Sequence, residues 1–149
     1  MSGLRRRDAL LSLAGLVAFA GVIRPQSASA AATPFTFNSI YAKDNVLSDA
    51  ALALTGQPIT MRGFMAPPLK PDVPFFVLTK LPMAVCPFCD SELDWPNDIV
   101  LVRLRGRQDW VDFNQPIVVT GTLALGTEID AATGFVSRVR LVDANFELG

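Results

Sequence analysis

The sequence has 149 residues, 13 basic and 14 acidic side chains, and no histidine. Without histidine it lacks the commonest general base and the commonest metal ligand, which excludes catalytic triads and histidine-based zinc sites. Four of the basic and one of the acidic residues lie in the first 30, so the rest carries 9 and 13 and a net charge near −4. An acidic chain of this kind argues against nucleic acid as a partner.

Residues 1–30 are typical of a cleavable export signal. Arg5-Arg6-Arg7 leads into an apolar run over 9–23, and Ala28-Ser29-Ala30 supplies the small residues that a signal peptidase requires. The run is shorter than the roughly 20 residues that cross a bilayer, so we expect no stable membrane insertion after cleavage. Residues 6–10 resemble a twin-arginine signal without its leading Ser or Thr, and a Sec signal is the alternative. The expected location is the bacterial periplasm.

Residues 31–57 are predicted to form an N-terminal arm with one short helix. Pro34 and spaced aromatic residues favour an extended segment, with room for a short edge strand. Ser48 is expected to cap a brief helix that runs through Leu54, because its hydroxyl can accept a hydrogen bond from a first-turn amide. Gly56 predicts the end of that helix.

Residues 58–149 are predicted to form one all-β domain. Strand-like composition occurs over 59–65, 75–79, 99–105, 116–125 and 136–148. The second of these runs is apolar throughout, which predicts burial on both faces, and the last two are predicted to pair as an antiparallel hairpin. Gly63 and Gly121 mark bends within strands. These features favour a small five-stranded OB-like barrel with at most one short helix, and a β-sandwich is the alternative.

Both cysteines and three carboxylates lie in one segment, residues 86–97, which we call the cysteine loop: Cys86-Pro87-Phe88-Cys89-Asp90-Ser91-Glu92-Leu93-Asp94-Trp95-Pro96-Asn97. In an oxidising compartment two cysteines at this spacing form a disulfide by default. That disulfide would shape the loop locally.

A metal site is the second interpretation of the cysteine loop. The thiolates of Cys86 and Cys89 would bind the ion, and a carboxylate from Asp90, Glu92 or Asp94 would complete the shell of zinc. Copper(I) would need only the two thiolates.

Thiol–disulfide exchange is the third interpretation, with Cys86 attacking and Cys89 resolving. Such a site usually opens a helix whose dipole lowers the pKa of the thiol. Here acidic residues and Pro96 follow the sulfurs, and no βαβ pattern surrounds them, so the sequence lacks the usual context of a thiol-exchange site.

Three further groups have both a functional and a structural interpretation. The two tryptophans either frame a groove or anchor a core. The methionines either bind copper(I) or fill the core. Three alternating arginines either bind an acidic partner or form a solvated strand face. We expect the structural role in each case. The residues are Trp95, Trp110, Met61, Met65, Met83, Arg103, Arg105 and Arg107.

The segment 54–67, with Gly63-Phe64-Met65-Ala66-Pro67, and the loop from Cys86 to Pro96-Asn97 resemble a family of exported bacterial domains of unknown function. The resemblance implies an OB-like fold, a periplasmic or lipid-anchored location, and association with ABC-type export systems, some linked to metal supply. We therefore expect an exported, non-enzymatic binding or accessory protein whose partner is an envelope transporter or another periplasmic protein. A periplasmic thiol–disulfide oxidoreductase is the alternative.

Overall fold

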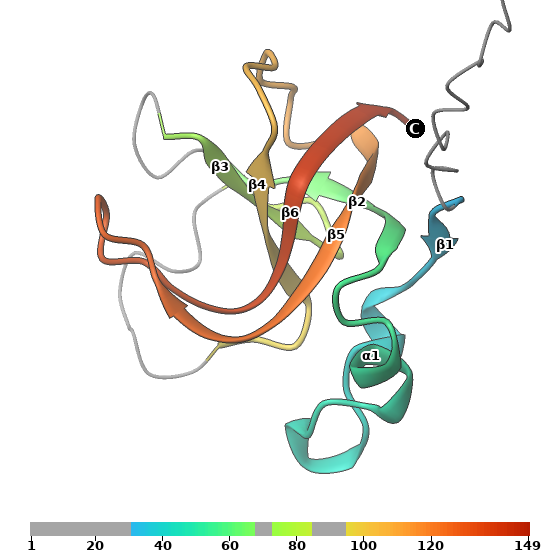
Figure 1. Cartoon of the computed structure of the whole chain (residues 1–149). Coiled ribbons are helices and arrows are strands. Elements are labelled where there is room, and N and C mark those ends of the chain that lie inside the picture. The colour runs from blue at the N-terminus through green and yellow to red at the C-terminus, as the bar shows by residue number, and fades with distance from the viewer. Residues whose placement is uncertain (1–30, 68–72, 85–94) are drawn as a thin grey trace, which may run out of the picture.

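The computed structural model describes residues 31–67, 73–84 and 95–149 (Figure 1). Within these ranges lie two short 3₁₀ turns, one α-helix and six strands. They are β1 (Thr33–Pro34), η1 (Phe37–Ser39), η2 (Lys43–Asn45), α1 (Asp49–Ala53), β2 (Pro58–Met65), β3 (Phe75–Thr79), β4 (Ile99–Leu104), β5 (Pro116–Ile129) and β6 (Val136–Leu148). No helix in these ranges is long and apolar enough to span a membrane. The chain is all-β with one short α-helix, as predicted.

Five strands close into a ring in the order β2-β3-β4-β6-β5, and β5 returns to pair with β2. All pairs are antiparallel except β4 and β6, which run parallel. The closing pair extends from Pro58 opposite Thr122 to Phe64 opposite Pro116. One ring of paired strands is a barrel, so the OB-like architecture is confirmed over the sandwich. The short β1 adds to the outside of β2 in parallel.

The N-terminal arm packs onto this barrel and shares its core. Phe35, Phe37, Ile40 and Ala51 belong to the same buried cluster as side chains from β2 to β6, and Figure 1 shows α1 below the barrel. The amide of Ala51 donates to Ser48 Oγ at 3.0 Å, and Gly56 follows the helix with φ +78°. The predicted cap and stop are therefore both present.

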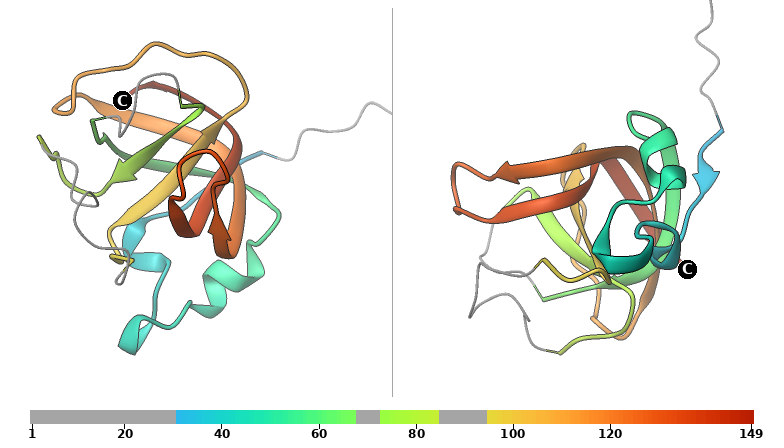
Figure 2. Two further views of the ribbon diagram at one scale, coloured as in Figure 1. Left: turned by 90° about the vertical axis from the view of Figure 1, so that its left-hand side faces the viewer. Right: turned by 90° about the horizontal axis from the view of Figure 1, so that it is seen from below.

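All five residues of β3 are buried, because both of its faces are covered. Phe76 and Leu78 lie in the main core. Val77 lies in a second cluster with Ala66 and Ile99, against which Trp95 and Phe135 pack. Phe135 comes from the connection between β5 and β6, the long hairpin visible in both views of Figure 2. This packing explains the unbroken apolar run in the sequence.

Two glycines permit the curvature of the ring. A Cβ on Gly63 would lie 2.6 Å from the carbonyl oxygen of Thr79, so only glycine allows β2 to approach β3 this closely. Gly121 lies where the pairing of β5 with β6 shifts register between Thr120 and Thr122. Asp143 on β6 has φ +50° beside this shift, as expected of a bulge that bends a strand.

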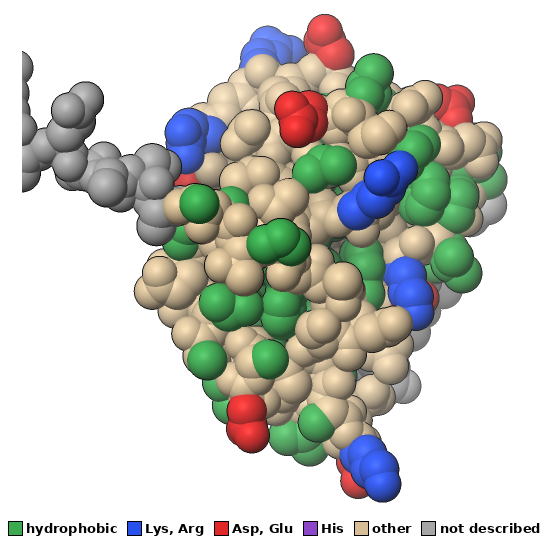
Figure 3. Space-filling model, turned by 90° about the vertical axis from the view of Figure 1, so that its right-hand side faces the viewer, with side chains coloured by type: hydrophobic (Ala, Val, Ile, Leu, Met, Phe, Trp, Pro, Cys, Tyr) green, Lys and Arg blue, Asp and Glu red, His purple; other side chains and the backbone are tan. Residues whose placement is uncertain are grey.

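Figure 3 shows the surface seen from the right-hand side of Figure 1. On the described part of this face, hydrophobic side chains appear in small groups among polar ones. Acidic and basic side chains are interspersed around its margin. Small groups of exposed apolar residues are normal on a protein surface and point to no particular partner.

Candidate functional site

The cysteine loop belongs to the connection between β3 and β4. These two strands are antiparallel neighbours, paired from Phe75 opposite Arg103 to Thr79 opposite Ile99. The amide of Lys80 donates to the carbonyl oxygen of Asp98 at 3.0 Å, which closes the base of the connection. The predicted ligands Cys86, Cys89, Asp90, Glu92 and Asp94 lie outside the described residues.

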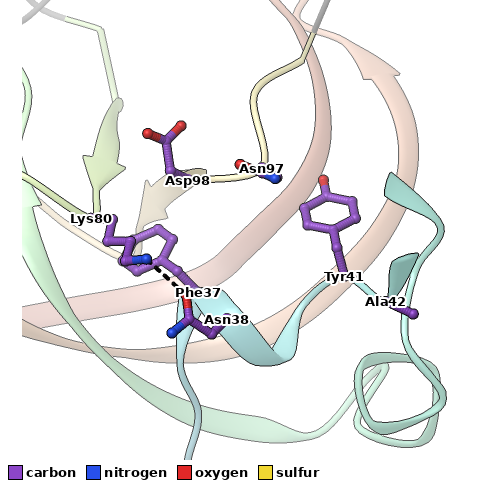
Figure 4. A pocket seen from close by; sticks show the side chains of 7 residues that line it. All are labelled: Phe37, Asn38, Tyr41, Ala42, Lys80, Asn97 and Asp98. Carbon is purple, nitrogen blue, oxygen red and sulfur yellow. Dashed lines mark hydrogen bonds between the residues drawn. The ribbon is translucent and has the colours of Figure 1, made fainter. Parts of the chain in front are cut away.

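The end of the cysteine loop borders a pocket of about 240 Å³, which we call the arm pocket (Figure 4). One wall comes from the N-terminal arm and the other from the ends of the β3–β4 connection. Its lining residues are Phe37, Asn38, Tyr41, Ala42, Lys80, Asn97 and Asp98. The barrel therefore places the described end of the loop, Asn97, at a polar recess.

Amides from the arm orient two polar side chains at this pocket. Lys80 Nζ donates to Asn38 Oδ1 at 2.8 Å, and Asn97 Nδ2 donates to Asn45 Oδ1 at 3.3 Å. Asn45 has φ +56°, a left-handed conformation that asparagine tolerates better than most residues. Both bonds join segments far apart in the sequence, so they also fasten the arm to the β3–β4 connection.

Two buried polar atoms near the pocket lack hydrogen bonds of good geometry within the described residues: Tyr41 Oη and Trp95 Nε1. Burial raises the pKa of Tyr41 above its ordinary 10.0, and the charge of Arg138 and the nearby indole of Trp95 oppose part of this rise. The indole therefore acts on the hydroxyl, but its alignment falls short of a hydrogen bond. Figure 4 shows the Tyr41 hydroxyl directed toward Asn97.

The tryptophans do not frame a common groove. Trp95 packs edge-to-face on Phe135, with ring centroids 6.1 Å apart. Trp110 packs on Phe76 at 6.4 Å and is 42% exposed. Each therefore packs on a different aromatic ring, but the expectation of two core anchors holds only for the partly buried Trp95, because Trp110 is exposed.

The methionines of β2 fill the core, as predicted. Met61 and Met65 are 1% and 2% exposed and lie in the main core cluster. Buried thioethers of this kind are gap fillers and offer a metal no access. In the described part of the chain, no three Cys, Asp, Glu or His side chains gather in a way that could hold a metal ion.

Of the three alternating arginines on and after β4, Arg103 and Arg105 make contacts with other parts of the barrel. Arg103 pairs with Glu128 at 2.9 Å and with Asp130 at 3.3 Å. Arg105 donates to the carbonyl oxygen of Asp143 at 3.3 Å. Hydrogen bonds from Thr133 hold the pKa of Asp130 below its usual value, which keeps this carboxylate ionised. These contacts tie the β5–β6 hairpin to β4 and agree with the structural interpretation.

Sequence reasoning missed two parts of this arrangement. The first is the buried Arg140, which is 5% exposed and donates a hydrogen bond to the carbonyl oxygen of Gly126 at 2.7 Å. Its Nε lies 3.2 Å from Glu128 Oε2, which is close enough for an ion pair but misaligned for a hydrogen bond. In the sequence, its position between two apolar strand residues indicated that this arginine could be buried. The pairing of Lys80 with Asn38 had no sequence signal, because the two are 42 positions apart.

Comparison with known proteins finds likeness at the level of fold. No protein-family model and no curated protein matches the chain. A solved structure of a DUF3299 family protein from Pseudomonas aeruginosa PAO1 is similar, with a TM-score of 0.50 and 16% sequence identity. The match covers 80% of this chain and 97% of that one. At this identity the likeness shows the fold alone: the chain shares its all-β architecture with a member of a bacterial domain family of unknown function.

Proposed function

We propose that this protein is an exported, non-enzymatic binding or accessory protein that acts through the cysteine loop, with an envelope ABC-type transport system as partner. The observation that carries the proposal is the position of the loop between two adjacent antiparallel strands of a small barrel. A barrel that presents a long connection between strands is a common design for binding sites.

The strands on either side of the loop favour binding over thiol exchange. A redox CxxC is typically placed at the start of a helix in a βαβ unit, where the helix dipole stabilises the thiolate. Here β3 and β4 are neighbours that run in opposite directions, and Lys80 pairs with Asp98 at the base of their connection. That context offers no parallel crossover. Exchange by Cys86 and Cys89 is therefore the competing outcome of the test.

We propose a metal as the ligand of the loop. Cys86 and Cys89 supply two thiolates, and Asp90, Glu92 and Asp94 supply carboxylates within the next five positions. Zinc accepts this mixture, and copper(I) accepts the two thiolates alone. A net negative loop would also attract a cation electrostatically.

The metal proposal is tested by native mass spectrometry combined with thiol titration, with and without a chelator. The expected result is a metal-bound mass that disappears with chelator as two free thiols appear. A Cys86→Ser, Cys89→Ser double variant should bind no metal. Asp109→Asn, a change at an exposed acid outside the loop, should bind as the parent does. A disulfide that resists mild reductant and ignores the chelator would contradict a metal site.

The thiol-exchange alternative is tested on the same purified protein by a turnover assay. An oxidoreductase would catalyse turnover of a dithiol substrate, and Cys86→Ser would abolish that turnover because it removes the attacking sulfur. Turnover that survives Cys86→Ser would eliminate this alternative. Absence of turnover in the parent protein would do the same.

Export is tested by fractionation of cells that express the full chain. The expected periplasmic form begins at Ala31, after cleavage behind Ala30. Replacing Arg6 and Arg7 with lysine should retain the precursor inside the cell if the twin-arginine route is used. Unchanged export of that variant would assign the Sec route instead, and a protein that stays in the cytoplasm uncleaved would refute the exported role.

We also propose that this chain belongs to the exported family that residues 63–67 resemble. Gly63 lies against Thr79, and Met65 and Ala66 are 2% exposed, so these motif residues serve packing in this barrel. A packing role supports a shared fold. The partner is tested by affinity purification of the periplasmic protein with crosslinking, where recovery of a transporter component is expected.

A further inference from the structure

We propose that the arm pocket binds a small organic monocarboxylate, with Lys80 as its charge partner. The pocket lies at the junction of the arm and the β3–β4 connection, and its described lining residues come from these two segments. This inference concerns a second site and does not depend on metal binding by the cysteine loop.

Lys80 forms no ion pair with another described residue. Its ammonium group has three donors, and Asn38 Oδ1 accepts from one of them at 2.8 Å. Arg103 and Arg140 pair with Glu128 and Asp130, away from this pocket. Because the hydrogen bond to Asn38 restrains the Lys80 side chain at the pocket, part of the ordering cost of binding is already met. An anion is the ligand that such a group favours.

The remaining charges select a single negative charge on the ligand. Asp98 lies on the same rim, so the formal charges of the lining residues cancel. The charge of Arg138 also reaches the Tyr41 side of the pocket, since it lowers the pKa of that residue. One carboxylate can pair with Lys80, and Asp98 repels a doubly charged phosphate about twice as strongly as it repels a single carboxylate. The amide of Asn97, oriented by Asn45, adds an uncharged donor.

The walls favour a flat, apolar body beside the carboxylate. Phe37 is 6% exposed and half-buried Tyr41 stands beside it, so aromatic surface lines the arm side of the pocket. Figure 4 shows Lys80 and Phe37 among the side chains that line the pocket. A volume of about 240 Å³ suits a small molecule rather than a peptide or a lipid chain.

The test is a titration of the isotope-labelled protein with benzoate, followed by amide chemical shifts in NMR spectra. Benzoate should cause saturable shifts at Phe37, Lys80 and Asn97 with a Kd of about 1 mM, an affinity in reach of so small a ligand. Benzamide has the same shape without the charge and should bind roughly tenfold more weakly, because a charge-assisted hydrogen bond is lost. Inorganic phosphate should bind more weakly than benzoate.

Two lysine variants make the assignment specific. Lys80→Ala should weaken benzoate binding roughly tenfold, whereas Lys43→Ala, which removes an exposed lysine outside the pocket, should not change it. The same spectra report whether each variant is folded. Equal binding of benzoate and benzamide, unchanged binding by Lys80→Ala, stronger binding of phosphate, or no saturable shifts would each overturn the proposal.

Failure of this proposal can be told apart from failure of the proposed function. The Cys86→Ser, Cys89→Ser double variant should retain benzoate binding, because the contacts proposed for benzoate come from Phe37, Lys80 and Asn97. Loss of benzoate binding in that variant would contradict two independent sites and overturn the assignment to the arm pocket.

Discussion

The side-chain amide of Gln108 pairs with both backbone groups of Phe146, as a neighbouring strand would. Gln108 Nε2 donates to the carbonyl oxygen of Phe146, and the amide of Phe146 donates to Gln108 Oε1, each at 3.0 Å. Phe146 in turn packs on Phe76 in the core, with ring centroids 5.6 Å apart. One glutamine therefore fastens the long connection between β4 and β5 to the edge of β6.

Replacing Gln108 with alanine should lower the free energy of unfolding by about 1 kcal/mol, because two exposed hydrogen bonds are lost and the backbone groups of Phe146 can turn to water. Urea denaturation followed by circular dichroism measures this change. Gln115→Ala is the matched control, since Gln115 contributes a backbone hydrogen bond that alanine keeps. Equal effects of the two variants would show that the pairing with Phe146 adds no stability.

Replacing Glu128 with glutamine should destabilise the protein by about 1–2 kcal/mol. The change leaves the nearly buried Arg140 without its ionic partner and weakens the contact with Arg103. Glu128 is 40% exposed and Arg140 keeps its bond to Gly126, so the loss stays below that of a fully buried pair. Thermal unfolding measures it, with the exposed Glu147→Gln as control. A negligible effect would mean that water replaces the carboxylate.

Replacing Gly63 with alanine should destabilise the barrel by about 1–3 kcal/mol. The new methyl group would lie 2.6 Å from the carbonyl oxygen of Thr79, so β2 and β3 would have to move apart. Gly106→Ala, where the added Cβ meets no atom within 4 Å, should change stability by less than about 0.5 kcal/mol. Similar unfolding midpoints for the two variants would refute the close approach of these strands.

Tyr41 should titrate above pH 10.0, because burial raises its pKa. It is the sole tyrosine of the sequence, so the ultraviolet absorbance of tyrosinate reports it without overlap from another. Since the folded pKa exceeds the unfolded one, its contribution to stability is complete below pH 10.0 and is lost as the pH rises through the folded pKa.

The charge of Arg138 should oppose part of the rise that burial causes in the pKa of Tyr41. Arg138→Met should raise the pKa of Tyr41 further, because the cation stabilises the phenolate. Arg62→Met, a change at another exposed strand arginine, should leave the titration unchanged. A pKa at or below 10.0 in the parent protein would contradict the burial of the hydroxyl.

The sequence by itself determined the local elements, because the physics that sets them acts over a few residues. Ser48 and Gly56 delimit α1 through a side-chain cap and a left-handed turn. The apolar run after Pro74 predicts β3, and the valine-containing run between Gly134 and Gly149 predicts β6, each at the residues observed. Gly63 was recognisable because a glycine inside a strand usually signals close approach. The barrel followed from strand count and the lack of helical periodicity.

Only the tertiary structure decided which residues meet. The arm pocket depends on Asn38 reaching Lys80 and on Asn45 reaching Asn97, contacts that span 42 and 52 positions. The buried charge of Arg140 likewise depends on a hairpin that returns Glu128 to β6. Short-range preferences carry no information about such pairs, because they arise when the ring closes and side chains from distant segments are brought into one space.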